Sequence, residues 1–288
     1  MYSFVGRMKI LVAGASGFIG RNLVPELLEE HEIRTLGRHR YEGEADKKAV
    51  ADLRNPEDYR QELEDVDIAY YLAHSLTGNR IFQEKEVEAA ESFVEACDEE
   101  NVDRIIYLSG IQPVDRPSRH LESRRKVGEV LASKEPELTE LRASIVLGKE
   151  SVSFQLMYQT VKKLPVILFP ESINSLSQPI YLEDAIHYLV EAAEREDTAG
   201  ETYDIGGKDI LKYREMMEIM AEELDTSTQI IRGPNLPVKM YSYCTRYYTD
   251  IDPNLAHSLM ESLKHDLTVK KGLKSEHKPL GYREAVKK

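Results

Sequence analysis

A glycine-rich turn between an apolar strand and an amphipathic helix constrains this fold more than any other feature. Residues 9–13 read KILVA, and GASGFIG follows directly. A turn of this kind needs Gly14 for a tight bend, Gly17 for a bare backbone and Gly20 where the helix meets the strand. The helix that begins there presents free N–H groups to an anion. The turn therefore predicts a strand-helix-strand unit that binds a pyrophosphate.

The rest of the first half alternates short apolar runs with amphipathic stretches, as buried parallel strands and their crossover helices do. This alternation predicts an α/β fold, a Rossmann-like doubly wound parallel sheet. The expected strands span 9–13, 33–36, 48–51, 68–72, 104–109 and 138–145. The expected helices span 18–30, 56–64, 80–100 and 119–133.

The pattern changes after residue 150 and predicts a smaller, mostly helical C-terminal lobe. We expect a nucleotide-binding domain at 8–165, completed by about 178–206, and a substrate or partner lobe at 207–288. Further elements are expected at 154–163, 177–184, 184–194, 201–205 and 213–224. Two amphipathic helices follow, 236–251 and 252–267, and Asp252-Pro253 is a strong start signal for the second. Their apolar stripes are Leu236, Met240, Tyr243, Tyr247 and Ile251, and then Leu255, Leu259, Leu263 and Leu267.

Composition excludes several classes of protein. A formal net charge of −13 argues against nucleic acid as a partner, because phosphate binding needs clustered Lys and Arg. The longest apolar run, LPVILFP, is far below the ~20 residues of a transmembrane helix. The first residues, MYSFVGR, lack the apolar core of a signal peptide. Cys97 and Cys244 have no metal-like spacing, so we expect a reduced cytoplasmic protein without a metal site.

The end of the second strand indicates which nucleotide binds. It reads LGRHR and supplies Arg38 and Arg40, where an NAD-preferring fold often carries an acidic residue for the ribose hydroxyl. An arginine pairs with a 2′-phosphate, whereas a carboxylate repels it. Arg38 therefore favours NADP(H) over NAD(H), and the alternative is a solvated basic turn.

Other cofactor contacts are expected where strands end at the same edge of the sheet. Asp52-Leu53 would border the adenine, and Ser109-Gly110 would lie beside the nicotinamide ribose. His74 is expected to be a hydrogen-bonded structural residue rather than an acid or base. The predicted cofactor-binding residues are Gly14, Ser16, Gly17, Phe18, Ile19, Gly20, Arg38, Asp52, Leu53, Leu72, Ala73, His74, Ser109, Gly110 and Arg125.

Several motifs together resemble a known superfamily. They are GASGFIG, Arg38, Asp52-Leu53, YYLAHS, YLSG, HLESR, LRASIVLG and QPIYLED. With them the chain resembles an atypical member of the short-chain dehydrogenase/reductase superfamily. It is most similar to the NAD(P)H-binding branch that includes the nucleotide-binding accessory subunit of respiratory complex I, and it shares an overall plan with sugar-nucleotide epimerases. The resemblance implies that the second lobe covers the nicotinamide and receives the substrate.

The resemblance also exposes a departure. Active members use a tyrosine for proton transfer and a lysine four residues later that lowers its pKa. Counting back from Glu129 places Leu121 and Arg125 in these positions. Leucine cannot transfer a proton, and a permanently charged arginine can hold only the ribose or a phosphate.

Two interpretations of RHLESRRKVGE, residues 119–129, remain open. In one, His120, Ser123 or Arg124 contacts the substrate or transfers a proton. In the other, the segment is a charged surface helix in which Glu122 pairs with Lys126. The candidate catalytic residues are His120, Ser123 and Tyr181. Gln178 and Asp184 accompany Tyr181 in the same motif. Asp184 is expected to start a helix or to join the lobes rather than to act in catalysis, because an Asp at a helix start needs no other explanation.

These observations favour an NADPH-dependent oxidoreductase acting on a small, fairly apolar carbonyl or conjugated substrate. The alternative is a non-catalytic NADPH-binding structural or redox-sensing protein, whose C-terminal helices bind a protein partner or a second copy. An epimerase is less favoured because its chemistry also uses the missing tyrosine. Membrane docking through 236–251 is least favoured, because this helix carries few basic residues. The tyrosine-rich segment 241–248 fits a substrate roof, a core or a dimer face.

Overall fold

The computed structural model describes residues 6–74, 80–113, 117–170, 172–234 and 236–288. The first five residues, part of the MYSFVGR segment, and Ser75 of the YYLAHS motif lie outside the described residues. All fifteen predicted cofactor-binding residues and the three catalytic candidates lie within them.

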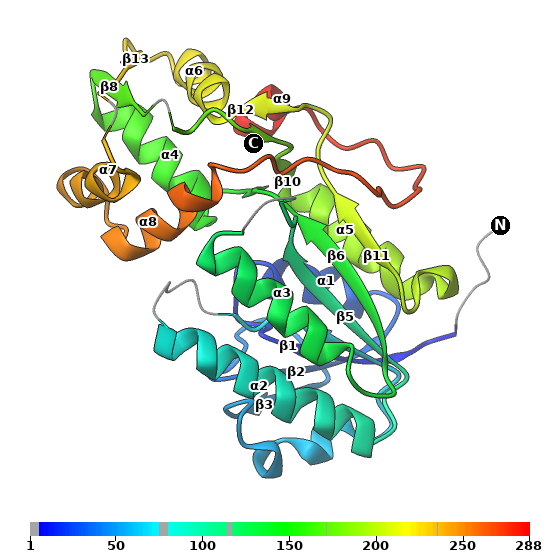
Figure 1. Cartoon of the computed structure of the whole chain (residues 1–288). Coiled ribbons are helices and arrows are strands. Elements are labelled where there is room, and N and C mark those ends of the chain that lie inside the picture. The colour runs from blue at the N-terminus through cyan, green and yellow to red at the C-terminus, as the bar shows by residue number, and fades with distance from the viewer. Residues whose placement is uncertain (1–5, 75–79, 114–116, 171, 235) are drawn as a thin grey trace.

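A seven-stranded parallel sheet forms the centre of the molecule, in the order β11-β6-β5-β4-β1-β2-β3 (Figure 1). The strand order reverses between β1 and β4, and ligands of such sheets bind in the crevice at that point. The doubly wound sheet predicted from the sequence is thus confirmed. Its strands are β1 (Lys9–Ala13), β2 (Glu32–Gly37), β3 (Lys47–Val50), β4 (Ile68–Tyr71), β5 (Arg104–Gly110), β6 (Glu137–Ala143) and β11 (Thr202–Ile205).

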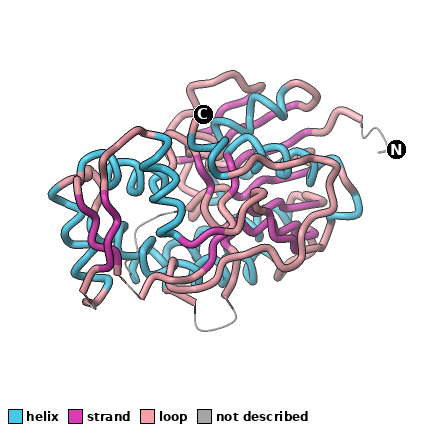
Figure 2. The backbone as a smooth tube through the Cα atoms, turned by 90° about the horizontal axis from the view of Figure 1, so that it is seen from above, coloured by secondary structure: helices cyan, strands magenta, loops and turns pink. Residues whose placement is uncertain are grey.

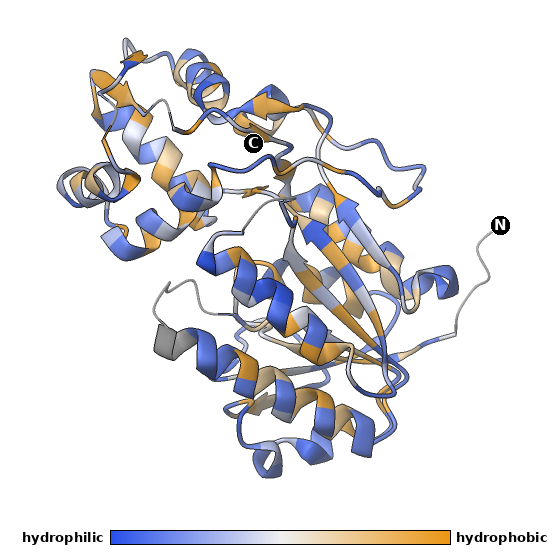
Figure 3. Cartoon of the chain, in the orientation of Figure 1, coloured by the Kyte–Doolittle hydropathy of each residue, from blue (hydrophilic) through white to orange (hydrophobic). Residues whose placement is uncertain are grey.

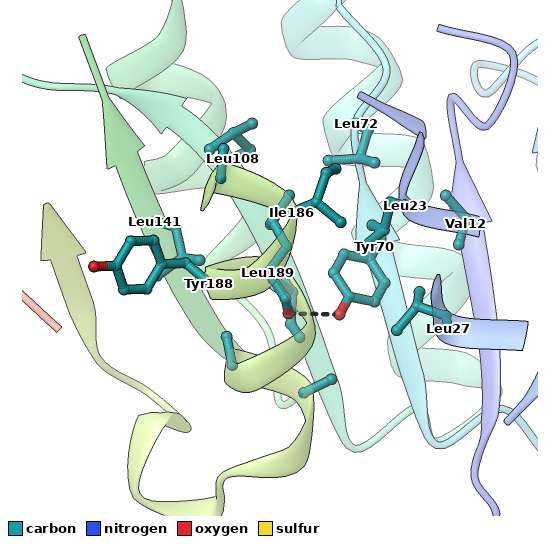
Figure 4. Close-up of a cluster of buried hydrophobic side chains, with 14 of the residues drawn as sticks. Val12, Leu23, Leu27, Tyr70, Leu72, Leu108, Leu141, Ile186, Tyr188 and Leu189 are labelled. Carbon is teal, nitrogen blue, oxygen red and sulfur yellow. Dashed lines mark hydrogen bonds between the residues drawn. The ribbon is translucent and has the colours of Figure 1, made fainter. Parts of the chain in front are cut away.

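Helices bury both faces of the sheet. α1 (Gly20–Leu28) and α5 (Leu182–Glu194) cover one face, and α2 (Arg80–Glu99) and α3 (Arg119–Leu131) cover the other (Figure 1). Under α5, the Tyr70 hydroxyl donates to the Leu189 carbonyl at 2.8 Å within an apolar cluster (Figure 4). This bond satisfies the one polar atom of a fully buried tyrosine.

A second lobe stands beside the carboxyl edge of the sheet, at the left of Figure 2. It contains α4 (Val152–Lys163), α6 (Tyr213–Glu223), α7 (Val238–Cys244), α8 (Pro253–Ser262) and α9 (Tyr282–Val286). Its separate apolar core joins residues on both sides of position 165. Short strands complete the fold: β8 (Val166–Phe169) with β13 (Gln229–Arg232), β9 (Leu176–Ser177) with β12 (Leu211–Lys212), and β7 (Val146–Leu147) with β10 (Ile180–Tyr181).

Some boundaries differ from the sequence prediction. The helix expected at 56–64 is two short 3-10 turns, η1 (Pro56–Asp58) and η2 (Arg60–Leu63). A third, η3 (Glu196–Thr198), precedes β11. Of the strand expected at 177–184, Ser177 belongs to β9, Ile180–Tyr181 form β10, and Leu182 begins α5.

The helix expected at 236–251 ends at Cys244 and continues as a 3-10 turn, η4 (Thr245–Tyr247). Its predicted apolar stripe faces solvent, since Met240, Tyr243 and Tyr247 are more than half exposed. The buried face is instead Val238, Ser242 and Thr245, side chains small enough for close packing, and the two hydroxyls bond to backbone carbonyls. The start signal of the next helix is confirmed, because Asp252 Oδ1 accepts from the Asn254 and Leu255 amides.

Candidate active site

A cavity of about 680 Å³ lies between the carboxyl edge of the sheet and the second lobe. The loops after β1, β2, β4 and β5 form one wall together with α3. Residues of α4, α6 and α8 form the opposite wall. The cavity therefore occupies the crevice where the topology of the sheet predicts a ligand.

The glycine loop forms the floor of the cavity. Gly14 has a φ of +89°, and a Cβ there would lie 2.7 Å from the Ala73 amide nitrogen. A Cβ on Gly20 would lie 2.5 Å from the Gly14 carbonyl oxygen, so the helix crosses the turn at a distance only glycine allows. Gly17 lines the cavity with a bare backbone, beside Ser16 and Phe18. This cradle fits the pyrophosphate of a dinucleotide.

Arginines lie at one end of the cavity. Arg38 lines it from the end of β2 with an exposed side chain, whereas Arg40 does not line it. Arg54, which the sequence analysis missed, also lines it and holds Asp52 through two hydrogen bonds of 3.0 and 2.6 Å. These bonds hold the pKa of Asp52 at about 2. The signal for Arg54 was its place two residues after Asp52, in the loop that follows β3.

The residues at the ends of β4 and β5 line the middle of the cavity, at the edge of the sheet where the sequence predicted cofactor contacts. Leu72, Ala73 and His74 line it from one strand, and Ser109 and Gly110 line it from the other. The Ser109 hydroxyl is buried and has no hydrogen-bond partner in the part of the chain that the structure describes. An orphaned hydroxyl at this edge fits the hydrogen-bonding groups of a bound ribose or substrate.

Helix α3 faces the cavity through His120, Leu121 and Arg124. Arg124 Nη1 donates to the Leu108 carbonyl at 3.1 Å, which fixes its guanidinium at the end of β5. Arg125 points away and forms an exposed ion pair with Glu129. The two residues spaced by four that face the cavity are therefore His120 and Arg124. Each lies one residue before the position, Leu121 or Arg125, that was obtained by counting back from Glu129.

The other two catalytic candidates do not line the cavity. The Ser123 hydroxyl donates to Glu86 Oε2 at 2.7 Å, and this bond joins α3 to α2. The Tyr181 hydroxyl lies 3.3 Å from Glu183 Oε1. The cavity instead contains Lys85 and Glu86 of α2, which the sequence analysis missed. They lie four and three residues before Ala89, another lining residue, and the charged sequence of this helix carries no motif that distinguishes them.

Two of the imidazoles that line the cavity, those of His120 and His74, are held neutral. Burial, and then the nearby Arg124 guanidinium, lower the pKa of His120 to about 4. The positive charge of Arg124 also lowers the pKa of His74, whose side chain is solvent-exposed. His74 Nδ1 lies 3.3 Å from the Leu72 carbonyl oxygen. At neutral pH these side chains can donate or accept a hydrogen bond, but neither is an imidazolium acid.

The second-lobe wall is apolar and carries no cation among the described lining residues. Its largest side chains are Leu156, Tyr213, Leu259, Leu263 and Leu267. All lining Lys and Arg side chains come from the sheet, its loops, α2 and α3. The two walls therefore differ in chemistry, one cationic and one apolar.

Two polar residues fasten the lobes together outside the cavity. Asp184, buried in the first turn of α5, accepts from the Leu280 amide at 3.0 Å and lies 2.7 Å from His277 Nε2. Gln178 Nε2 donates to the Gly207 carbonyl, and its Oε1 accepts from the Val269 amide. Through these contacts Asp184 joins the start of α5 to residues 277–280.

Across the described ranges, no cluster of three or more His, Cys, Asp or Glu side chains is arranged to hold a metal ion. Among the same residues, no helix is both long enough and apolar enough to cross a lipid bilayer.

Sequence comparisons agree with this geometry. Residues 14–146 match the model of a family described as NAD(P)H-binding. The chain is 24% identical over 248 residues to the mitochondrial NADH dehydrogenase [ubiquinone] 1 alpha subcomplex subunit 9 of Arabidopsis thaliana, covering 81% of this chain and 62% of that protein. It is 25% identical over 253 residues to the mitochondrial NADH-ubiquinone oxidoreductase 40 kDa subunit of Neurospora crassa, covering 82% and 66%. The match thus spans less than two thirds of each relative's length.

Solved structures share the fold. A nucleoside-diphosphate-sugar epimerase from Staphylococcus aureus superposes with a TM-score of 0.75 at 14% identity, covering 98% of this chain and all of that one. A short-chain dehydrogenase/reductase superfamily protein from Agrobacterium tumefaciens with bound NAD gives 0.66 at 14% identity, covering 88% and 96%. Residues 14–146, which include the glycine cradle, are thus similar to an NAD(P)H-binding family, and the chain as a whole shares the fold of short-chain dehydrogenase/reductase and epimerase proteins.

Proposed function

We propose that the protein is an NADP(H)-dependent oxidoreductase that acts on a small, fairly apolar carbonyl or conjugated substrate. One observation carries this proposal: a single cavity joins the glycine loop and Arg38 to an apolar wall formed by Leu156, Leu259 and Leu263. A protein that only stored a nucleotide would need no apolar space beyond it. Enclosed apolar space with a few polar groups at one end is typical of a site for a small organic substrate.

The preference for NADP(H) rests on the arginine end of the cavity. Arg38 lines the cavity with its side chain exposed, so it can pair with a 2′-phosphate. Arg54 adds a second guanidinium, although Asp52 partly neutralises it. Two arginines and one carboxylate leave a net positive charge, which supports the phosphorylated cofactor.

The preference for a neutral substrate rests on the second-lobe wall. A sugar nucleotide would bring a second diphosphate, which requires cations near the far wall of the cavity. The described lining residues of the second lobe include no Lys or Arg. The wall therefore supports an uncharged, apolar substrate over a sugar nucleotide.

When bound, NADPH supplies the hydride. The Ser109 hydroxyl and a neutral His120 N–H are the two donors placed to orient a substrate oxygen at the end of β5. The Arg124 guanidinium favours negative charge on that oxygen as it develops. The proton that completes a carbonyl reduction then comes from water through one of these donors.

A binding assay followed by a turnover assay tests the proposal. NADPH at a hundredfold excess over its dissociation constant should stabilise the protein by about 2.7 kcal/mol, and NADH at the same concentration should stabilise it less. Oxidation of NADPH is then followed with quinones, enals and ketones. We expect turnover with at least one apolar class, and equal stabilisation by both nucleotides would contradict the cofactor preference.

The second candidate function is a nucleotide-binding protein without turnover. Two observations favour it: the cavity-facing pair on α3 is His120 and Arg124 rather than a tyrosine and a lysine, and His120 is held neutral. The relatives named as subunits of NADH-ubiquinone oxidoreductase also support a role within an assembly, with α7 and α8 contacting a protein partner or a second copy. Stabilisation by NADPH with no oxidation in any substrate class would select this function.

A further inference from the structure

Charge is distributed unevenly along this acidic chain. Residues 151–170 and 226–249 contain none of its 51 Asp and Glu residues. They contain five of its 38 Lys and Arg residues, so these stretches carry +5 and the rest of the chain carries −18. All five cations are exposed: Lys162, Lys163, Arg232, Lys239 and Arg246.

The two acid-free stretches lie together in the fold. β8 pairs in parallel with β13, and the Thr228 hydroxyl donates to the Val161 carbonyl at 2.8 Å. A Cβ on Gly233 would lie 2.6 Å from the Tyr241 hydroxyl and 3.2 Å from Leu168 Cβ, so α7 lies close to this ribbon. The elements occupy the end of the second lobe farthest from β11, at the left of Figures 1 and 2.

The same end exposes most of the large apolar side chains that reach solvent. Of ten such exposed side chains among the described residues, seven belong to the two stretches. Along β8, exposed and buried residues alternate. Ile167 and Phe169 pack in the apolar core that includes residues of α6, so Val166 and Leu168 lie on the opposite, solvent-exposed side of the ribbon. Figure 3 shows β8 in the colour of hydrophobic residues. We name these seven side chains and the five cations the distal face. Its apolar members are Val166, Leu168, Ile231, Leu236, Met240, Tyr243 and Tyr247.

The two aromatic side chains of the distal face, Tyr243 and Tyr247, form cation–π contacts with an arginine. The Arg246 guanidinium lies 4.1 Å from the ring centroid of Tyr243 and 4.7 Å from that of Tyr247. Tyr247 is 73% exposed, the highest value among the large apolar side chains that reach solvent. Amphipathic tyrosines and arginine stems are suited to the boundary between water and hydrocarbon.

From this arrangement we infer that the distal face docks the protein peripherally on the surface of an anionic lipid bilayer. Negative headgroups attract the five cations, and the aliphatic side chains enter the headgroup boundary. The absence of carboxylates from both stretches lowers the repulsion that a −13 protein would otherwise meet at such a surface. Segment 236–251 alone has few basic residues, but the fold adds Lys162, Lys163 and Arg232 from outside it.

The sequence provides a clean reporter, because the chain contains no tryptophan. Tyr247→Trp places a single indole on the distal face, and Val50→Trp places one on β3, where Val50 is 56% exposed. With vesicles of phosphatidylcholine and phosphatidylglycerol, we expect the emission of the Tyr247→Trp protein to shift to the blue. The Val50→Trp emission should stay unchanged, and vesicles of phosphatidylcholine alone should shift neither.

Paired lysines provide a matched test of the electrostatic part. Lys162→Gln with Lys163→Gln should lower affinity for the anionic vesicles about 30-fold, as about fivefold per lysine near such a surface predicts. Lys47→Gln with Lys48→Gln removes two adjacent exposed lysines from β3 and should leave the affinity unchanged.

Three results would overturn the inference. The first is no blue shift of Tyr247→Trp on anionic vesicles, and the second is an equal loss of affinity in the two lysine pairs. The third is a protein that does not bind vesicles but forms a concentration-dependent oligomer in sedimentation, with the oligomer abolished by Lys162→Gln and Lys163→Gln together. That last result would assign the distal face to a second copy, whose acidic surface is also complementary to it.

Discussion

The two walls of the cavity are built in different ways. The cofactor end of the sheet wall depends on contacts between neighbours in sequence: Gly14 and Gly20 fit against each other, and Arg54 holds Asp52 two residues away. The second-lobe wall is assembled from residues more than a hundred positions apart, between Leu156 and Leu267. Recognition of the cofactor is therefore encoded locally, whereas recognition of the substrate is a product of tertiary packing.

The largest effect is expected from Gly20→Val. Its Cβ would meet the Gly14 carbonyl oxygen at 2.5 Å and the Ala15 Cα at 2.6 Å, both of them backbone atoms that cannot move aside. We expect complete loss of the thermal shift that NADPH produces. Gly6→Val is the control, because a Cβ at Gly6 meets nothing within 4 Å. If the Gly20→Val protein still bound NADPH, the contact between Gly14 and Gly20 would not be required for cofactor binding.

Arg38→Asp tests the cationic end of the same wall. Loss of a charge-assisted hydrogen bond costs about 1.5–3 kcal/mol, and the new carboxylate adds repulsion, so NADPH should bind roughly 100-fold more weakly. NADH, which lacks the 2′-phosphate, should be affected little. Arg40→Asp, outside the cavity, should change neither affinity in a calorimetric titration. An equal loss of affinity for NADPH and NADH would show that Arg38 does not bind the 2′-phosphate.

His120 lies where the two walls meet and makes stability depend on pH. Its folded pKa of about 4 lies below the unfolded value of about 6.5, so the unfolded chain binds more protons between these pH values. The stabilisation is complete above pH 6.5 and is lost as pH falls through about 4. After allowance for partial exposure, His120→Gln should flatten this decline by about 2 kcal/mol in urea unfolding. An unaltered slope in His120→Gln would show that its imidazole is not held neutral.

The smallest effect is expected in the second-lobe wall. Leu259→Gln places a polar amide in the apolar wall, and loss of one leucine contact corresponds to about tenfold in the KM of an apolar substrate. The affinity for NADPH should stay unchanged, because Leu259 lies on α8, opposite the glycine loop. Leu255→Gln, on the same helix but outside the lining, is the control. A matching loss of NADPH affinity would show that the two walls are not separable.

The contrast between the walls also explains how far the sequence could be interpreted. Gly14, Gly17, Gly20, Arg38 and Ser109 were predicted because a strand end or a turn fixes each one within a few residues. Every predicted strand of the central sheet is present. Arg125 was expected in the cavity because its position was counted from Glu129, and only the rotation of α3 shows that His120 and Arg124 face inward.

Other features depend on packing that no local pattern reports. The stripe of Met240, Tyr243 and Tyr247 has helical spacing, yet it faces solvent because the small side chains of Ser242 and Thr245 make the closer contact. Lys85 and Glu86 enter the cavity from a helix whose charged sequence has no motif. Periodicity identifies an amphipathic face but does not say which face meets the protein.

One contact at the cavity has a consequence for how the chain folds. The Ser118 hydroxyl, which caps α3, lies 2.8 Å from that of Ser262 at the end of α8, and the two residues are 144 positions apart. Closing so long a loop carries an entropic cost, and chains dominated by such distant contacts fold slowly. We therefore expect the sheet wall to form first and the apolar wall to dock on it in a slower phase. A nucleotide already bound to the sheet would shorten that search by holding the docking surface in place.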